Sequence, residues 1–257
     1  MGLRITVLGS GNSTGVPFAD GTWGNCDSHE ARNRRRRASI LIEREGTRVL
    51  IDAGPDVREQ MLSAKVDRLD AVIFTHAHAD HTAGIDDLRV FGMFGHDPLP
   101  VYAYPEVLDQ IRGRFGYMFG SGRKGYYDKP TLRPIEALPE FSIGALDFSL
   151  FEQDHTVCRS AGIRVGPFAY STDVKSLSDE AFQRLAGLGV WLIAAVRREP
   201  HIAHAHLEVV LDWIRRVQPA RAFLTHMNHT MDYRTLFDEL PDGVMPAFDG
   251  QVMEFDD

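Results

Sequence analysis

Short runs of apolar, β-branched and aromatic residues recur along the whole chain, and most are bounded by glycine, proline or aspartate. Runs of this length with such boundaries are typical of buried strands. They predict strands at 3–8, 38–43, 48–51, 70–74, 99–103, 146–151, 160–165, 167–171, 190–196 and 221–225. The early strands follow one another closely, as in hairpins, whereas the later ones are separated by longer segments.

Several of the intervening segments repeat apolar residues at the three- and four-residue spacing of an amphipathic helix. Some begin with a cap residue or a proline, which favours a helix start. The predicted helices cover 55–65, 82–94, 105–117, 178–188, 206–217 and 233–240. No repeat of fixed period is visible, so we expect residues 1–257 to form one domain. Sheets inside and helices outside predict an α/β sandwich.

The composition permits a soluble enzyme and argues against several other classes. With 257 residues, of which 44% are hydrophobic, the chain can bury a full core. A net charge of −8 disfavours a surface devoted to nucleic acid. Two cysteines, Cys26 and Cys158, are too few for a disulfide framework. The N-terminus has no signal peptide or membrane span, so we expect a cytoplasmic protein without a membrane partner.

Metal-capable side chains are concentrated directly after the predicted strand 70–74. They are His76, His78, Asp80 and His81. Zinc and manganese accept imidazole and carboxylate ligands, and an extended turn can aim the first two rings at one ion while the other two face a second. The alternative is a polar loop that caps the next helix. Asp80 alone would suit a cap, but the three histidines would not.

Three further candidate ligands stand at the ends of later predicted strands. His155 follows the strand 146–151, Asp173 follows 167–171, and His226 follows 221–225. A lone histidine is more often a satisfied loop or core residue than a ligand. Three such positions added to the first cluster favour a site for two metal ions.

In this order, the seven residues resemble the metallo-β-lactamase superfamily, whose signature His-x-His-x-Asp-His is followed by a distant His, Asp and His. Asp52-Ala53-Gly54 also resembles the earlier Asp-x-Gly element of that superfamily, and we interpret Asp52 as a supporting residue. The resemblance implies a four-layer αββα sandwich. It also implies two metal ions at one edge of the sheets.

Other segments resemble a narrower branch, the phosphoribosyl 1,2-cyclic phosphate phosphodiesterases of bacterial phosphonate degradation. These segments are 8–17, 23–26, 226–229 and 248–250. The branch is a sister of the transfer-RNA 3′-processing endonucleases. It has a catalytic histidine before a late helix, and His204 takes that place here, with His201 and His206 as neighbours that could be confused with it.

The resemblance also implies a ligand set and a mechanism. It assigns His76, His78 and His155 to one ion, Asp80, His81 and His226 to the other, and Asp173 to both. Two divalent ions, Mn²⁺ or Zn²⁺, would generate hydroxide at neutral pH for attack on phosphorus. His204 would protonate the leaving oxygen, and we count Asp80 with it as catalytic. The expected substrate is a small, cyclic phosphodiester such as a phosphoribosyl or nucleoside cyclic phosphate.

The chain departs from this branch at a structural zinc site, where relatives use a Cys-x-Cys-x-x-Cys group and a later histidine. Cys26 and His229 are kept, and His29 stands in place of the last cysteine, but the first cysteine is missing. One interpretation is an additional structural Zn²⁺ on Cys26, His29 and His229 with a fourth ligand elsewhere. The other is a lost site in which Cys26 is an ordinary small apolar residue.

Two alternative functions remain open. Segment 112–133 interleaves basic, glycine and aromatic residues, and 32–37 holds five arginines, which would suit an RNA-processing endonuclease. The interpretation that we prefer for these segments is a loop and a solvated charge run, and a lid over a small phosphorylated sugar or nucleotide fits as well as RNA binding does. The net negative charge disfavours RNA as the partner. The second alternative is a non-catalytic binding or carrier protein of the same fold. The sequence leaves a homodimer open.

Overall fold

The computed structural model describes residues 2–93, 96–120 and 129–256. In the first sheet, the strands are β1 Leu3–Gly9, β2 Ser39–Arg44, β3 Thr47–Ile51, β4 Ala71–Ile73, β5 Leu99–Ala103, β6 Leu132–Glu136 and β14 Val252–Phe255. In the second sheet, they are β7 Glu140–Ile143, β8 Leu146–Asp154, β9 Arg159–Val165, β10 Phe168–Ser171, β11 Val190–Ala194, β12 Arg221–Thr225 and β13 Val244–Pro246.

The two sheets are built on the same plan. Their orders are β14-β1-β2-β3-β4-β5-β6 and β13-β12-β11-β10-β9-β8-β7. In the first sheet the pairs from β14 to β3 are antiparallel and those from β3 to β6 are parallel. In the second, the pairs from β7 to β10 are antiparallel and those from β10 to β13 are parallel. Thus β3 and β10 hold equivalent places, each between an antiparallel and a parallel neighbour.

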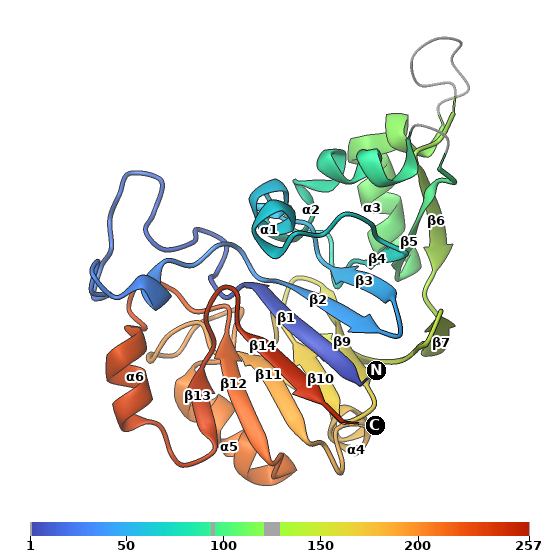
Figure 1. Ribbon diagram of the computed structural model, residues 1–257. Helices are drawn as coiled ribbons and strands as arrows, with labels where there is room; N and C mark the ends of the chain where they lie inside the picture. The colour runs from blue at the N-terminus through green and yellow to red at the C-terminus, as the bar shows by residue number, and fades with distance from the viewer. Residues whose placement is uncertain (1, 94–95, 121–128, 257) are drawn as a thin grey trace.

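Helices cover the outer face of each sheet (Figure 1). The α-helices are α1 Val57–Ala64, α2 Ala79–Thr82, α3 Pro105–Phe115, α4 Asp179–Arg184, α5 Leu207–Val217 and α6 Tyr233–Glu239, and the 3-10 helices are η1 Ala31–Asn33, η2 Ile85–Gly92 and η3 Gly116–Phe119. Helices α1 and α3 share one apolar cluster with the first sheet, whereas α4, α5 and α6 share another with the second. A third cluster fills the space between the sheets. The predicted αββα sandwich is therefore confirmed. No described helix is long and apolar enough to cross a membrane.

The predicted helix at 82–94 is wrong. Thr82 ends α2, and the chain then continues as the 3-10 helix η2. The break falls at Gly84, where a Cβ atom would lie only 2.0 Å from the carbonyl oxygen of Gly54. Because glycine has no Cβ atom, the backbone at Gly84 can lie close to the backbone at Gly54. The amphipathic pattern of the sequence does not reveal this contact.

Among the described residues, four strands were not predicted from the sequence, and they are the edge strands of the two sheets, β6, β7, β13 and β14. Each has exposed or half-exposed positions, and β6 and β13 contain Pro134 and Pro246. Such strands lack the continuous apolar run by which central strands are recognised.

Candidate metal centre

The histidine-rich loop begins where β4 ends. This strand is fully buried because it lies inside the first sheet, between β3 and β5. The backbone is extended at His78, with φ −63° and ψ 153°, and turns helical at Ala79. The Thr82 hydroxyl donates to the His78 carbonyl at 2.8 Å and closes this turn. The first two histidines therefore belong to an extended segment and the later Asp80 and His81 to a short helix.

The other predicted ligands follow strands of the second sheet. His155, Asp173 and His226 come after β8, β10 and β12, which all run in the same direction. Asp173 and His226 have left-handed backbones, with φ 47° and 54°. Asp52, which follows β3 in the first sheet, is also left-handed, with φ 61°. Non-glycine residues adopt this conformation at a cost in conformational energy and are enriched at functional sites.

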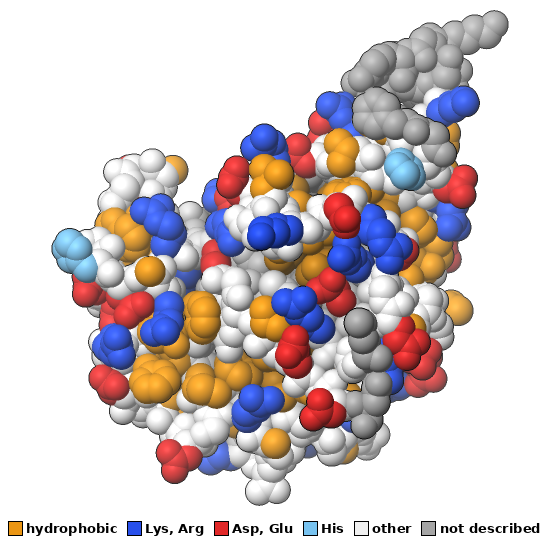
Figure 2. All heavy atoms as spheres, viewed as in Figure 1, with side chains coloured by type: hydrophobic (Ala, Val, Ile, Leu, Met, Phe, Trp, Pro, Cys, Tyr) orange, Lys and Arg blue, Asp and Glu red, His pale blue; other side chains and the backbone are white. Residues whose placement is uncertain are grey.

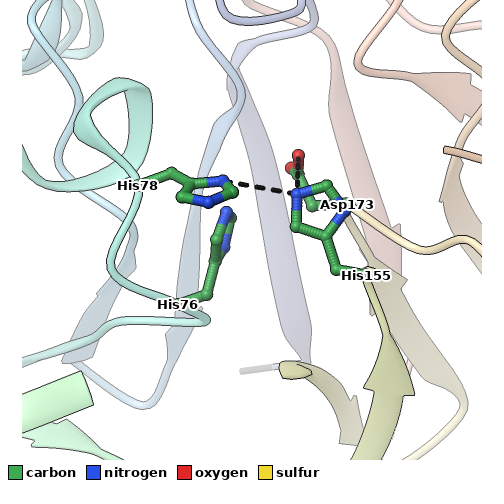
Figure 3. A group of neighbouring side chains, drawn as sticks. All are labelled: His76, His78, His155 and Asp173. Carbon is green, nitrogen blue, oxygen red and sulfur yellow. Dashed lines mark hydrogen bonds and ion pairs between the residues drawn. The ribbon is translucent and has the colours of Figure 1, made fainter. Parts of the chain in front are cut away.

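The structure brings all seven predicted ligands together in two groups that share one residue. The first group is His76, His78, His155 and Asp173, and the second is Asp80, His81, Asp173 and His226. Within each group, the candidate ligand atoms lie within 4.8 Å of one another. Figure 3 shows the first group, in which rings from the loop after β4 face His155 and Asp173 from the second sheet.

The two carboxylate oxygens of Asp173 face different groups. Its Oδ1 lies 3.5 Å from His155 Nε2 in the first group. Its Oδ2 lies 2.9 Å from His81 Nε2 and 3.2 Å from His226 Nε2 in the second. Asp173 thus stands between the two groups, which is the place that the sequence comparison implied for it.

Hydrogen bonds behind the ligands fix which ring nitrogen is free. The carboxylate of Asp52, buried at 0% exposure, accepts from the Thr75 amide and hydroxyl and lies 2.7 Å from His81 Nδ1. His155 Nδ1 lies 2.9 Å from the carbonyl oxygen of Ala203. With Nδ1 engaged in this way, both rings present Nε2 to their group, as is usual for metal-binding histidines.

The donor set fits divalent ions. Among the described residues, Nε2 of His76 is buried without a hydrogen-bond partner, and Nε2 of His81 and of His226 both face the same carboxylate oxygen of Asp173. His78 Nδ1 and His155 Nε2 lie 3.3 Å apart, so two ring nitrogens converge on one point. Buried polar atoms normally have partners, and several imidazole nitrogens around one carboxylate are ligands that zinc or manganese accept.

The charges of these side chains also favour the binding of divalent ions. Burial and the neighbouring His81 hold the pKa of His76 well below its usual range, so this ring is neutral. Burial opposes ionisation of Asp173, but His226 and His81 outweigh it and hold its pKa well below the usual range. Burial likewise disfavours the charged form of His81, yet the surrounding carboxylates of Asp173, Asp52 and Asp80 raise its pKa well above the usual value. A proton on His81 offsets this negative charge, and an ion that binds there must displace it.

His204 lies against both groups, just before α5. Its ring centroid is 4.7 Å from that of His155 and 5.2 Å from that of His226. Its Nδ1 is 3.6 Å from Asp173 Oδ1 and is buried without a hydrogen-bond partner. Of its two neighbours, His201 contacts only the ring of His204 among these residues, and His206 is the cap residue of α5. The geometry therefore favours His204 among the three.

The structure does not gather the predicted structural-zinc residues. Cys26, His29 and His229 form no group of metal-capable atoms among the described residues. The sulfur of Cys26 accepts from the guanidinium of Arg35 at 3.8 Å, His229 packs its ring on Phe18, and His29 is exposed. A zinc ion on these three residues stays a prediction, and the geometry lends it no support.

Three arginines of the run 32–37 have a structural role that the sequence did not indicate. Arg35 is only 2% exposed and donates to the carbonyls of Asn228 and Met231 and to Asn33 Oδ1. Arg36 pairs with Asp249, and Arg37 pairs with Asp56. These arginines fasten the long segment between β1 and β2 to the rest of the protein, including the residues after His226. The predicted RNA-binding segment 112–133 includes residues 121–128, which lie outside the described residues.

Comparison with known proteins identifies the family. A model described as "Beta-lactamase superfamily domain" matches residues 47–227. A solved diphosphatase of the PhnP family is 30% identical, with a TM-score of 0.90 over 99% of this chain and 98% of that one. An octanoyltransferase of Porphyromonas gingivalis is 34% identical over 96% of this chain and 51% of its own length. A ribonuclease Z of Bradyrhizobium diazoefficiens is 35% identical over 46% of this chain and 36% of its own length. The chain thus spans about half or less of these two curated relatives. It belongs to the beta-lactamase superfamily and, within it, to the PhnP family.

Proposed function

We propose that this protein is a dinuclear metal-dependent phosphodiesterase that hydrolyses a small phosphodiester, preferably a cyclic one. The observation that carries the proposal is the place of Asp173, whose two oxygens face separate groups of histidines. The similarity to a diphosphatase of the same family supports chemistry at phosphorus. Phosphoribosyl and nucleoside cyclic phosphates are the substrates that we expect.

Seven side chains would hold the ions. His76, His78 and His155 serve one ion, Asp80, His81 and His226 serve the other, and Asp173 serves both. Zn²⁺ and Mn²⁺ are the candidates because both accept imidazole and carboxylate. When bound, two such ions lower the pKa of a water and offset the negative charge of phosphoryl oxygens.

Two side chains of the site are proposed to act on the substrate. His204 is the only described histidine outside the ligand groups whose ring contacts rings of both groups, which places it to donate a proton to the leaving oxygen. Burial and the neighbouring His226 lower its pKa to about 3 in the absence of bound metal and substrate, so this role requires that the substrate's negative charge favour the protonated ring. Asp80 has Oδ2 at 3.2 Å from His81 Nε2, and its side chain remains 14% exposed. Its second oxygen can orient the attacking water. Both side chains are only partly exposed, which limits competing water.

The test is a panel of phosphodiesters assayed with manganese and with zinc. It contains phosphoribosyl 1,2-cyclic phosphate, 2′,3′-cyclic nucleotides and linear diesters. We expect turnover of at least one cyclic substrate, abolished by a chelator and restored by the metal. A protein that binds two equivalents of metal and hydrolyses none of the panel would refute the proposal and favour the binding or carrier alternative.

An RNA endonuclease is the second candidate, because ribonuclease Z relatives match part of the chain. On the face shown in Figure 2, Lys and Arg side chains lie interspersed with Asp and Glu rather than in one basic patch. Arg35, Arg36 and Arg37 are engaged within the fold. A small substrate is therefore the better fit. Cleavage of a precursor transfer RNA at submicromolar enzyme would reverse this preference.

A further inference from the structure

Two buried serines hold equivalent places in the two sheets. Ser39 opens β2 and Ser160 lies near the start of β9, and both are 0% exposed. The β2–β3 register pairs Ile40 with Ile51, and the β9–β10 register pairs Ile163 with Tyr170. If each register is continued toward the site, Ser39 stands opposite Asp52 and Ser160 stands opposite Asp173.

Each serine hydroxyl binds the backbone of the aspartate opposite to it. Ser39 Oγ donates to the Asp52 carbonyl at 2.9 Å and lies 3.0 Å from the carbonyl oxygen of Ile51. Ser160 Oγ donates to the Asp173 carbonyl at 2.9 Å and lies 3.4 Å from that of Thr172. These carbonyls are within the protein, where a lost hydrogen bond is not replaced by water.

A third residue fixes the direction of the second hydroxyl. The side-chain amide of Gln153, which is 1% exposed, donates to Ser160 Oγ at 3.1 Å. Because that contact occupies a lone pair of the serine oxygen, the hydroxyl proton is left to point at the backbone carbonyls. The same amide also donates to the carbonyl of Thr172 at 2.9 Å, so the strand end before Asp173 is held from two sides.

Both aspartates need such support because their backbones are left-handed, with φ 61° at Asp52 and 47° at Asp173. A chain that turns out of a sheet in this way leaves carbonyls without the partners that the ladder would supply. The direction of each carboxylate depends on the turn. Asp173 faces both ligand groups directly, whereas Asp52 acts through other residues: it lies 2.7 Å from His81 Nδ1 and accepts from the Thr75 hydroxyl, which lies 3.0 Å from His76 Nδ1.

We infer that Ser39 and Ser160 are positioning residues that hold the left-handed turns of Asp52 and Asp173 and thereby set the geometry of the metal centre. The inference rests on the proposed function in that the two groups bind ions. The two serines differ in how directly they act. Ser160 supports the ligand shared by both ions, so its loss weakens both. Ser39 supports a residue that stands behind one ligand of each group, so its loss weakens both to a smaller extent.

The test compares Ser160→Ala and Ser39→Ala with the control Ser171→Ala. Ser171 is also 0% exposed and accepts from Trp191 Nε1 at 3.0 Å, but it binds neither turn. Zinc or manganese affinity is measured by competition with a chelating dye, and the melting temperature of each metal-free protein is measured in parallel. Ser160→Ala should weaken both binding steps by about 10- to 100-fold, and Ser39→Ala should weaken them by a smaller factor. Ser171→Ala should lower the melting temperature while leaving both affinities unchanged, and the Ser160→Thr and Ser39→Thr variants, which keep the hydroxyl, should regain most of the affinity.

Unchanged affinities in Ser160→Ala would overturn the inference, and so would a larger loss of affinity in Ser39→Ala than in Ser160→Ala. If Ser160→Ala does not fold, the metal affinities of Ser39→Ala and of the threonine variants still test whether loss of a serine hydroxyl weakens metal binding. Crystal structures of the metal-free variants give a measurement that needs no ion. Asp52 and Asp173 should leave the left-handed region when their serine is lost, and unchanged φ angles would count against the inference. Wild-type protein that binds no metal would defeat the proposed function but leave this structural comparison valid.

Discussion

Replacing Arg35 by methionine tests whether a buried cation stabilises the segment that follows His226. Methionine keeps most of the aliphatic stem, so the change removes mainly the guanidinium. The carbonyl of Asn228 also accepts from the Met231 amide, and Asn33 Oδ1 also accepts from the Tyr233 amide. Among the described residues, only the Met231 carbonyl loses its sole donor. One buried carbonyl without a donor costs about 1–3 kcal/mol.

An opposing effect has to be subtracted from this cost. Burial lowers the pKa of Arg35, which means that the folded protein disfavours its charge, and methionine removes that penalty. The loss of the remaining charge-assisted hydrogen bonds adds to the destabilisation. We therefore expect Arg35→Met to reduce the free energy of unfolding by about 2 kcal/mol and to lower the melting temperature by roughly 4–8 °C.

Urea unfolding followed by circular dichroism, with a thermal scan, measures the change. Arg34→Met is the matched control, since Arg34 is exposed and contacts only the Trp23 ring among the described residues. We expect the control to change stability by less than about 0.5 kcal/mol. An Arg35→Met variant as stable as the wild type or more stable would show that desolvation of the guanidinium outweighs its hydrogen bonds, which would refute the reasoning.

Three further predictions concern the candidate site and the helix α6. His204→Ala should lower kcat by about 10²- to 10⁴-fold with unchanged metal content, and full turnover on the true substrate would exclude the assigned role. Asp173→Asn should reduce occupancy at both metal positions, and elemental analysis that finds two full equivalents would contradict the shared ligand. Asp232→Ala removes the N-cap of α6, whose hydrogen bonds to Thr235, Asp27 and Asn33 outweigh burial and lower its pKa to about 2. The variant should lose about 1 kcal/mol in urea at neutral pH. Because the folded pKa is depressed, this stabilisation is present above the unfolded pKa of about 3.9 and is lost as the pH falls toward 2, so a gap between wild type and variant that persists at pH 2 would argue against it.

The grouping of the candidate ligands could be predicted because their positions follow from strand ends. His155, Asp173 and His226 each come after an apolar run, and parallel or co-directional strands bring such ends to one edge of the fold. The central strands were predictable for the same reason, since burial on both faces imposes a continuous apolar run.

What the sequence did not reveal depends on contacts between distant segments. Arg35 reads as one of five neighbouring arginines, and only the folded chain shows that Asn228 and Met231 surround it. No local sequence pattern marks Ser39 and Ser160, because their role depends on hydrogen bonds to aspartates that follow the neighbouring strand. The 3-10 helix η2 forms where Gly84 meets Gly54, a tertiary contact that outweighs the helical pattern.

The polar edge strands have a consequence for how this protein behaves in concentrated solution. An open edge exposes unpaired amide and carbonyl groups that can recruit a strand from another molecule and start aggregation. Here β6 and β13 contain Pro134 and Pro246, and β7 and β14 contain Glu140 and Glu254. Proline removes a donor from the edge, and a charged side chain there disfavours the approach of a second chain. The residues that hid these strands from the sequence prediction are thus the ones that keep the sheets from growing between molecules.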